Sequence, residues 1–200
     1  MTKPVQVIGF REMKNAEGKI IINTTSKSTN WSKGLSPFYL GSVELYGGHV
    51  AKNVENAWQF SKVYPEYADE EQNPTDEYFK WAKEGWTDSY AHRYPMGKGK
   101  IPLYSYWEGH KLTYIEARRA IYAPIYAKAV VNTPAFEQLL DLYESGEDFV
   151  PIYWMATEDH DFEEIHYFNY EDKKFQWNKN ASGPVGRLDL EDLDKVFEAF

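Results

Sequence analysis

The alternation of hydrophobic and polar positions divides the first part of the chain into short strands and one clear helix. Residues 4–9 and 19–23 are apolar runs that predict strands on either side of a polar turn. Residues 40–46, followed by a Gly-Gly pair, predict a hairpin. Residues 53–64 predict a helix, because apolar positions recur along one helical face and Asn53 can cap its first turn.

The middle of the chain predicts two further helices around a long loop. Residues 75–83 have helical spacing and are followed by Gly85, which predicts the end of that helix. The glycines and prolines of residues 85–111 predict a long structured loop, a kind of segment that often carries function. A capping box at Thr113 opens a helix over 113–131, and Pro124 should kink or break it.

The pattern changes after the next helix, which begins at Thr133-Pro134 and ends at Gly146. Residues 150–155 then predict a strand, and 165–178 predict a hairpin. Residues 190–200 predict a terminal amphipathic helix. We therefore expect an α+β fold. A mostly helical domain with a small mixed or antiparallel sheet covers 1–148, and a C-terminal strand-hairpin-helix extension covers 149–200, packed on the first part.

Composition narrows the possible partners. The net charge is −9, and residues 151–200 contribute most of it with 12 acidic and 5 basic side chains. Such a chain repels phosphate backbones, so nucleic acid is not expected as a partner except as a carrier of a modified base. Cysteine is absent, which excludes disulfides and thiolate chemistry. No apolar run is long enough to span a membrane, so we expect no membrane partner and a cytoplasmic setting.

The most informative chemistry lies on the predicted helix over 53–64. Glu55, Gln59 and Lys62 are spaced by four and three residues, which places a carboxylate, an amide and an ammonium on one helical face. Such a face is suited to a polar, phosphate-bearing ligand. The same spacing is also typical of an ordinary solvated face with an ion pair, so spacing alone favours no site.

A recognisable motif begins at Ser36-Pro37-Phe38, continues through the glycine-closed hairpin, and ends with Val54-Glu55 followed by an aromatic residue, Gln59 and Lys62. On this motif, residues 24–145 resemble the NADAR superfamily, in a phage-type uncharacterised branch. This resemblance implies a hydrolase that cleaves an N-glycosidic bond of an ADP-ribose-type compound, with no metal and no cofactor. The expected partner is a small phosphate-bearing nucleotide ligand.

The resemblance also implies roles for individual residues. Glu55 would be catalytic, stabilising an oxocarbenium-like sugar and activating water. Tyr104 or Trp107 could stack on a base or be core residues. Apart from the resemblance, Arg118 lies at the start of a predicted helix, where positive charge is unfavourable, so we expect it to pair with a carboxylate or a phosphate. The expected ligand-binding residues are Gln59, Lys62, Ser36, Phe38, Tyr104, Trp107 and Arg118.

The C-terminal part contains two unusual stretches, the run from Val150 to Ile165 and the later Gly183-Pro-Val-Gly-Arg187. On these stretches, residues 150–200 resemble a different family, the bacillithiol-forming cysteine-adding ligase. This resemblance implies thiol-ligase chemistry within a larger nucleotide-binding-like domain, with glucosaminyl-malate as the acceptor of cysteine. Two alternatives to the hydrolase therefore stay open. One is a non-catalytic, phage-type binding protein, and the other is a thiol-ligase fragment.

Overall fold

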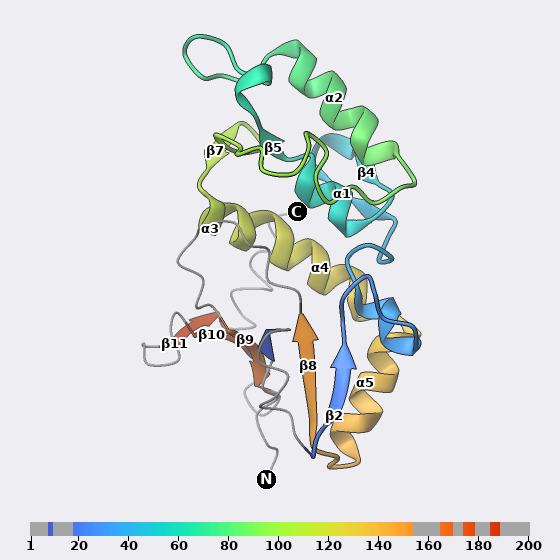
Figure 1. The fold of residues 1–200 in the computed structure, drawn as a ribbon. Helices are drawn as coiled ribbons and strands as arrows, with labels where there is room; N and C mark the ends of the chain where they lie inside the picture. Colours follow the sequence, from blue (N-terminus) through green and yellow to red (C-terminus); the bar gives the residue numbers. More distant parts are fainter. Residues whose placement is uncertain (1–7, 10–17, 154–164, 170–173, 179–184, 189–200) are drawn as a thin grey trace. The chain divides into compact units, whose positions relative to one another are not determined.

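The computed structural model describes residues 8–9, 18–153, 165–169, 174–178 and 185–188 (Figure 1). Residue contacts divide the chain into two compact units. Unit 1 combines Met1–Lys33 with Glu137–Phe200, and unit 2 is Gly34–Phe136. The sequence boundary at 148/149 differs from this division, because the contacts group the first 33 residues with the C-terminal part.

Unit 1 contains a parallel sheet whose strands come from two distant parts of the sequence. Strand β8 (Phe149–Tyr153) lies between β1 (Ile8–Gly9) and β2 (Ile20–Asn23), and both neighbours run parallel to it. Parallel strands need a long crossover between them. Here the whole of unit 2 and the helix α5 (Pro134–Glu144) separate β2 from β8 in sequence. The sequence did not predict this parallel pairing, because the paired strands lie far apart in the sequence.

The C-terminal strands form a separate antiparallel sheet. Strand β10 (Lys174–Asn178) pairs with β9 (Ile165–Asn169), as the predicted hairpin requires. The structure adds β11 (Val185–Leu188), which pairs with the other edge of β10. The helix predicted over 190–200 lies outside the described residues.

Helix α1 (Val54–Gln59) occupies the core of unit 2, and all six of its residues are buried. Asn53 caps it as predicted, accepting a hydrogen bond from the backbone N–H of Asn56 at 2.7 Å. The helix is shorter than predicted because the chain turns at Phe60 and enters strand β5 (Lys62–Val63). Lys62 therefore lies on a strand and not on the helix of Glu55.

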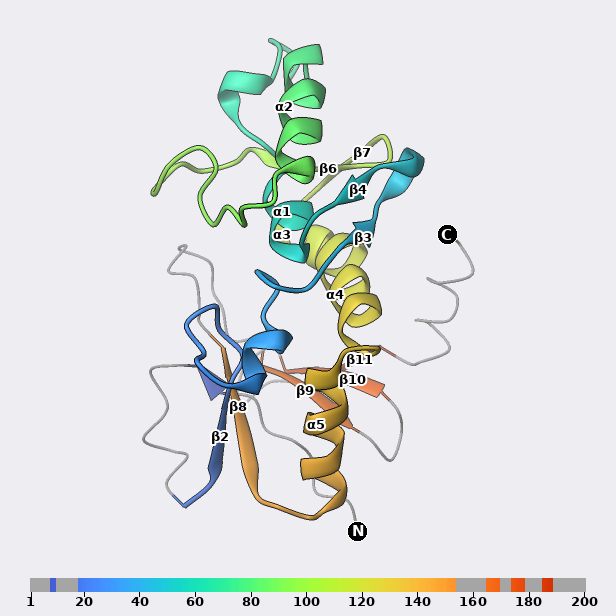
Figure 2. The same ribbon diagram turned by 90° about the vertical axis from the view of Figure 1, so that its right-hand side faces the viewer.

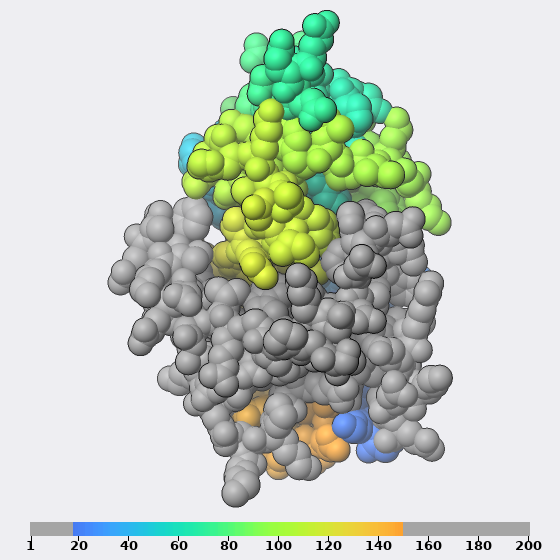
Figure 3. Space-filling model, turned by 90° about the vertical axis from the view of Figure 1, so that its left-hand side faces the viewer, coloured from blue at the N-terminus to red at the C-terminus, as the bar shows by residue number. Residues whose placement is uncertain are grey.

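Strand β5 is the edge of a three-stranded antiparallel sheet with β6 (Tyr104–Trp107) and β7 (His110–Leu112). The turn between β6 and β7 has positive φ at Glu108 and Gly109, as tight hairpins require. Part of the predicted loop over 85–111 is thus a hairpin. Figure 3 shows the yellow-green chain around this hairpin at the surface of unit 2.

Helix α2 (Asp76–Thr87) begins where the sequence predicted a helix, and the structure shows that Thr75 caps it, since its hydroxyl accepts a hydrogen bond from the backbone N–H of Tyr78. It does not end at Gly85, as the sequence suggested, but continues for two more residues. Gly85 is buried where the Phe60 ring approaches the helix backbone. The glycine therefore serves close packing here, and not helix termination.

The long helix predicted over 113–131 is confirmed, together with its irregularity. It consists of α3 (Tyr114–Ala117), a π-helical turn η5 (Arg118–Tyr122) and α4 (Ala123–Val130). Thr113 and Glu116 form the predicted capping box. Proline cannot donate the usual helical hydrogen bond, and the wider turn comes immediately before Pro124 in α4. Helix α1 packs against η5 and α4.

The hairpin predicted over 40–46 is present as β3 (Val43–Glu44) and β4 (Val50–Ala51), which pair antiparallel (Figure 2). The remaining short helices are 3-10 turns: η2 (Trp31–Leu35), η3 (Tyr46–Gly48) and η4 (Pro65–Tyr67). Helices and small sheets together confirm the α+β class. In the described part of the chain, no helix combines the length and apolar character that a membrane span requires.

Candidate functional site

Glu55 lies in the first turn of α1 and is only 6% exposed. Its backbone N–H donates to the carbonyl oxygen of Pro37 at 3.0 Å, which places the Ser36–Phe38 loop against the start of the helix. Its side-chain Oε1 accepts a hydrogen bond from Nε2 of Gln59 at 2.9 Å. Two residues of the predicted constellation are therefore in direct contact inside unit 2.

Burial changes the acidity of this carboxyl group. Loss of solvation raises the pKa of Glu55 to about 7, although the Gln59 hydrogen bond and the nearby charges of Lys62 and Arg93 act in the opposite direction. The group therefore changes between its neutral and charged forms close to neutral pH. Perturbed carboxyl groups of this kind are concentrated at functional sites, though ion-pair networks also produce them.

Two cationic side chains lie close to this carboxyl group. Lys62 is 4% exposed, and its Nζ lies 5.1 Å from the centroid of the Trp58 ring. The guanidinium carbon of Arg93 lies 5.1 Å from the centroid of the Phe38 ring. Lys62 thus comes close to Glu55 from β5, and not through the helical spacing that suggested it.

The helix over 114–130 supplies a second side of the site. Trp58 packs edge-on against Tyr114 and Tyr122, with ring centroids 5.7 and 5.5 Å away. Burial raises the pKa of Tyr122, the charge of Glu55 raises it further, and Arg118 lowers it. The guanidinium of Arg118 also lies over the Tyr114 ring. Arg118 therefore contacts the Tyr114 ring, which itself packs against Trp58 of α1.

Ser36 and Phe38 differ in their surroundings. Ser36 is fully buried, and its Oγ has no hydrogen-bond partner within the described residues. Its backbone oxygen accepts hydrogen bonds from the N–H groups of Tyr39 and Leu40. Phe38 is half-buried under Arg93. The loop that carries both is held against α1, so the two predicted residues lie near Glu55.

The recorded contacts of Tyr104 and Trp107 are with other parts of unit 2. The Tyr104 hydroxyl donates to the carbonyl oxygen of Gln72 at 2.6 Å. Trp107 is buried and packs against Tyr46, with ring centroids 4.7 Å apart. The stacking role expected of these two residues stays a prediction.

The structure also adds residues that the sequence did not single out. Arg93 comes from the irregular segment after α2, where no periodicity marks it. Tyr122 lies one turn after Arg118 on the predicted helix. Its spacing from Arg118 was therefore the sequence signal that could have placed it on the same side of the helix. Among the described residues, no group of three or more histidine and acidic side chains is arranged to hold a metal ion.

Comparison with known proteins gives matches for the C-terminal part. The family described as "Bacillithiol biosynthesis BshC, N-terminal Rossmann-like domain" matches residues 124–200. The putative cysteine ligase BshC of Flavobacterium johnsoniae is 62% identical over 53 residues, covering 26% of this chain and 10% of the relative. The corresponding protein of Cytophaga hutchinsonii is 38% identical over 61 residues, covering 30% and 12%. The chain spans about a tenth of the length of these curated relatives. No solved structure matches the chain significantly.

These matches correct the predicted activity. The hydrolase acting on an N-glycosidic bond of an ADP-ribose-type compound is wrong, because the matching family and relatives are those of a cysteine ligase. Nothing in the comparisons supports the resemblance to the NADAR superfamily. The second resemblance is confirmed, and the family match begins earlier than expected, at residue 124. Residues 124–200 are thus similar to part of the Rossmann-like domain of BshC-type cysteine ligases.

Proposed function

We propose that residues 124–200 act as a segment of the Rossmann-like domain of a BshC-type cysteine ligase. The observation that carries this proposal is the 62% identity over 53 residues with the Flavobacterium johnsoniae relative. We infer that the role of this segment is to support the addition of cysteine to an acceptor such as glucosaminyl-malate.

The topology of unit 1 supports this assignment. Helix α5 leads into β8, and β8 pairs in parallel with β2 and β1, as strands of Rossmann-like sheets do. Both helix and strand lie in the matched range, whereas β1 and β2 come from residues before it. The early residues of this chain therefore supply the neighbours that β8 needs to complete its backbone hydrogen bonds.

A chimera tests this proposal. The 53-residue segment of the Flavobacterium johnsoniae relative is replaced by the matching segment of this chain, and cysteine addition to glucosaminyl-malate is measured. We expect the chimera to keep ligase activity, because most positions of the segment are unchanged. A second chimera with the same 53 residues in reversed order has equal length and composition, and it should be inactive.

We further propose that unit 2 binds a small phosphate-bearing ligand at Glu55. The supporting observation is that two cations lie around the buried Glu55 carboxyl group: the buried Lys62, whose Nζ lies over the Trp58 ring, and Arg93, whose guanidinium lies over the Phe38 ring. The two cations can pair with an anionic group of a ligand, and the protonated Glu55 carboxyl group can donate a hydrogen bond to that same group. The buried Ser36 hydroxyl adds a polar group without a partner in the described residues.

Binding of AMP, compared with adenosine, tests this second proposal. We expect AMP to raise the melting temperature while adenosine has no effect, because only AMP carries the phosphate. Lys62→Met and Arg93→Gln should each weaken AMP binding by about tenfold, the loss expected for one charge-assisted hydrogen bond. Lys100→Met is the control, since it removes one positive charge from an exposed ion pair with Glu66. Equal affinity for AMP and adenosine would contradict the proposal.

A further inference from the structure

Asn56 makes a set of contacts that the capping of α1 does not need. It is fully buried and follows Glu55 in the helix. Its Nδ2 donates to the carbonyl oxygens of Asp88 at 3.0 Å and Tyr90 at 2.8 Å, and its Oδ1 accepts from the backbone N–H of His92 at 2.8 Å. Both N–H donors and one acceptor site of this amide are therefore used by a single backbone segment.

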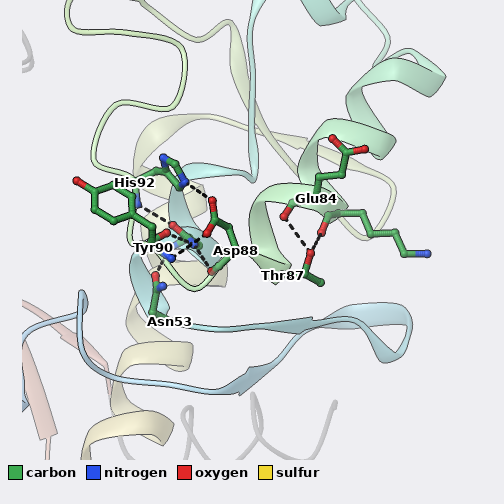
Figure 4. Close-up of polar contacts among 8 residues, drawn as sticks. Asn53, Glu84, Thr87, Asp88, Tyr90 and His92 are labelled. Atoms are coloured by element: carbon green, nitrogen blue, oxygen red, sulfur yellow. Dashed lines mark hydrogen bonds and ion pairs between the residues drawn. The ribbon is translucent and has the colours of Figure 1, made fainter.

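The segment 88–92 leaves α2 at its C-cap, Asp88, and has no regular hydrogen-bond ladder of its own. Inside the segment, the Asp88 carboxylate accepts from the backbone N–H of Tyr90 at 2.9 Å and pairs with Nε2 of His92 at 2.7 Å. Figure 4 shows Asp88, Tyr90 and His92 gathered around these contacts. The side chain of Asn56 thus replaces the partners that secondary structure would otherwise give to this backbone.

Arg93 follows this segment directly. The guanidinium of Arg93 lies over the Phe38 ring. Pro37, the residue before Phe38, accepts a hydrogen bond with its carbonyl oxygen from the backbone N–H of Glu55 at 3.0 Å. Two neighbouring residues of α1 are therefore connected to Arg93 by different routes. Asn56 reaches it through the backbone of 88–92, and Glu55 reaches it through the loop 36–38.

We propose that Asn56 is a positioning residue that holds Arg93 beside Glu55 by fixing the backbone of residues 88–92. This inference rests on the proposed binding site in unit 2, which needs Arg93 in place before the ligand arrives. A side chain as long as arginine loses much rotational freedom when it is placed. Anchoring the backbone next to it lowers the number of positions that the guanidinium can take, and so strengthens its action on Glu55.

The test measures how strongly Arg93 acts on Glu55 in three backgrounds, without any ligand. The pKa of Glu55 is read from the carboxyl ¹³C resonance, assigned by its loss in Glu55→Gln. The pKa of Glu55 is measured in three backgrounds: the wild type, Asn56→Ala and Asn53→Ala. In each background it is measured once with Arg93 present and once with Arg93→Gln. Asn53 is the matched control, because it is a buried asparagine that caps the same helix.

We expect Arg93→Gln to raise the pKa of Glu55 equally in the wild type and in Asn53→Ala, and by less than half as much in Asn56→Ala. An equal rise in all three backgrounds would overturn the proposal, and so would the absence of any rise in the wild type. If Asn56→Ala does not fold, Asn56→Ser takes its place, since it leaves a smaller cavity and keeps one polar group. Failure to bind AMP would overturn the binding site, but it would leave this titration result unchanged.

Discussion

Glu55→Gln is expected to change the free energy of unfolding differently at different pH values. At about pH 8 the substitution should be about 3 kcal/mol more stabilising than at about pH 4. The burial that raises the pKa of Glu55 from 4.5 to about 7 disfavours its charged form in the folded state. One pKa unit corresponds to roughly 1.4 kcal/mol. Glutamine keeps a similar shape and a hydrogen-bonding oxygen for Gln59, and it never has to be charged.

The sign of this effect follows from proton binding. Between the unfolded pKa of 4.5 and the folded pKa of about 7, the folded state binds more protons than the unfolded state. The stability of the wild type therefore falls as the pH rises through this window, and Glu55→Gln removes that fall. Urea unfolding at several pH values measures it. Glu84→Gln, at an exposed position of α2, should change stability by no more than about 0.5 kcal/mol at any pH. A pH-independent difference for Glu55→Gln would contradict the burial described above.

Gly85→Ala is expected to destabilise unit 2 by about 2 to 3 kcal/mol. A Cβ atom at this position would lie 2.1 Å from Cδ1 and Cε1 of the Phe60 ring, far inside van der Waals contact. Phe60 is buried and packs against Trp81, with ring centroids 4.7 Å apart, so the ring has little room to move. The helix propensity of alanine, which favours the substitution by about 1 kcal/mol, is too small to compensate for this clash.

A double-mutant cycle with Phe60→Ala separates the clash from other effects. In that background the ring is absent, so Gly85→Ala should cost nothing and recover its helix propensity. Gly109→Ala provides a comparison, because its φ is +86° but no atom lies near the new Cβ. Its cost should be about 1 kcal/mol, from backbone strain alone. An equal cost for Gly85→Ala in both Phe60 backgrounds would show that the ring is not the cause.

Local signals in the sequence predicted much of the fold. The predicted caps at Asn53 and Thr113 begin helices in the structure, the helix predicted over 75–83 is present as α2, and Pro124 follows the π-helical turn of the long helix. The end of α1 was missed, because pairing of β5 with β6 ends the helix, and that partner lies about 40 residues further along the sequence. The parallel pairing of β2 with β8 was missed for the same reason.

The candidate site shows the same limit. Glu55 and Gln59 could be paired from their spacing, whereas Lys62 lies near Glu55 from a strand that the spacing did not predict. Burial of Glu55 could not be derived from that spacing, which is equally typical of a solvated face. Arg93 and Asn56 could not be connected at all, because their link runs through hydrogen bonds between the Asn56 side chain and the backbone of residues more than 30 positions away.

The activity of the chimeric ligase tests the central assignment most directly. The rate of cysteine addition to glucosaminyl-malate is compared among the parental relative, the chimera and the chimera with the reversed segment. A segment of the same function should leave the rate within about tenfold of the parent, a barrier change of no more than about 1.4 kcal/mol. A folded chimera that is no more active than the reversed-segment control would contradict the assignment of this part of the chain to a cysteine ligase.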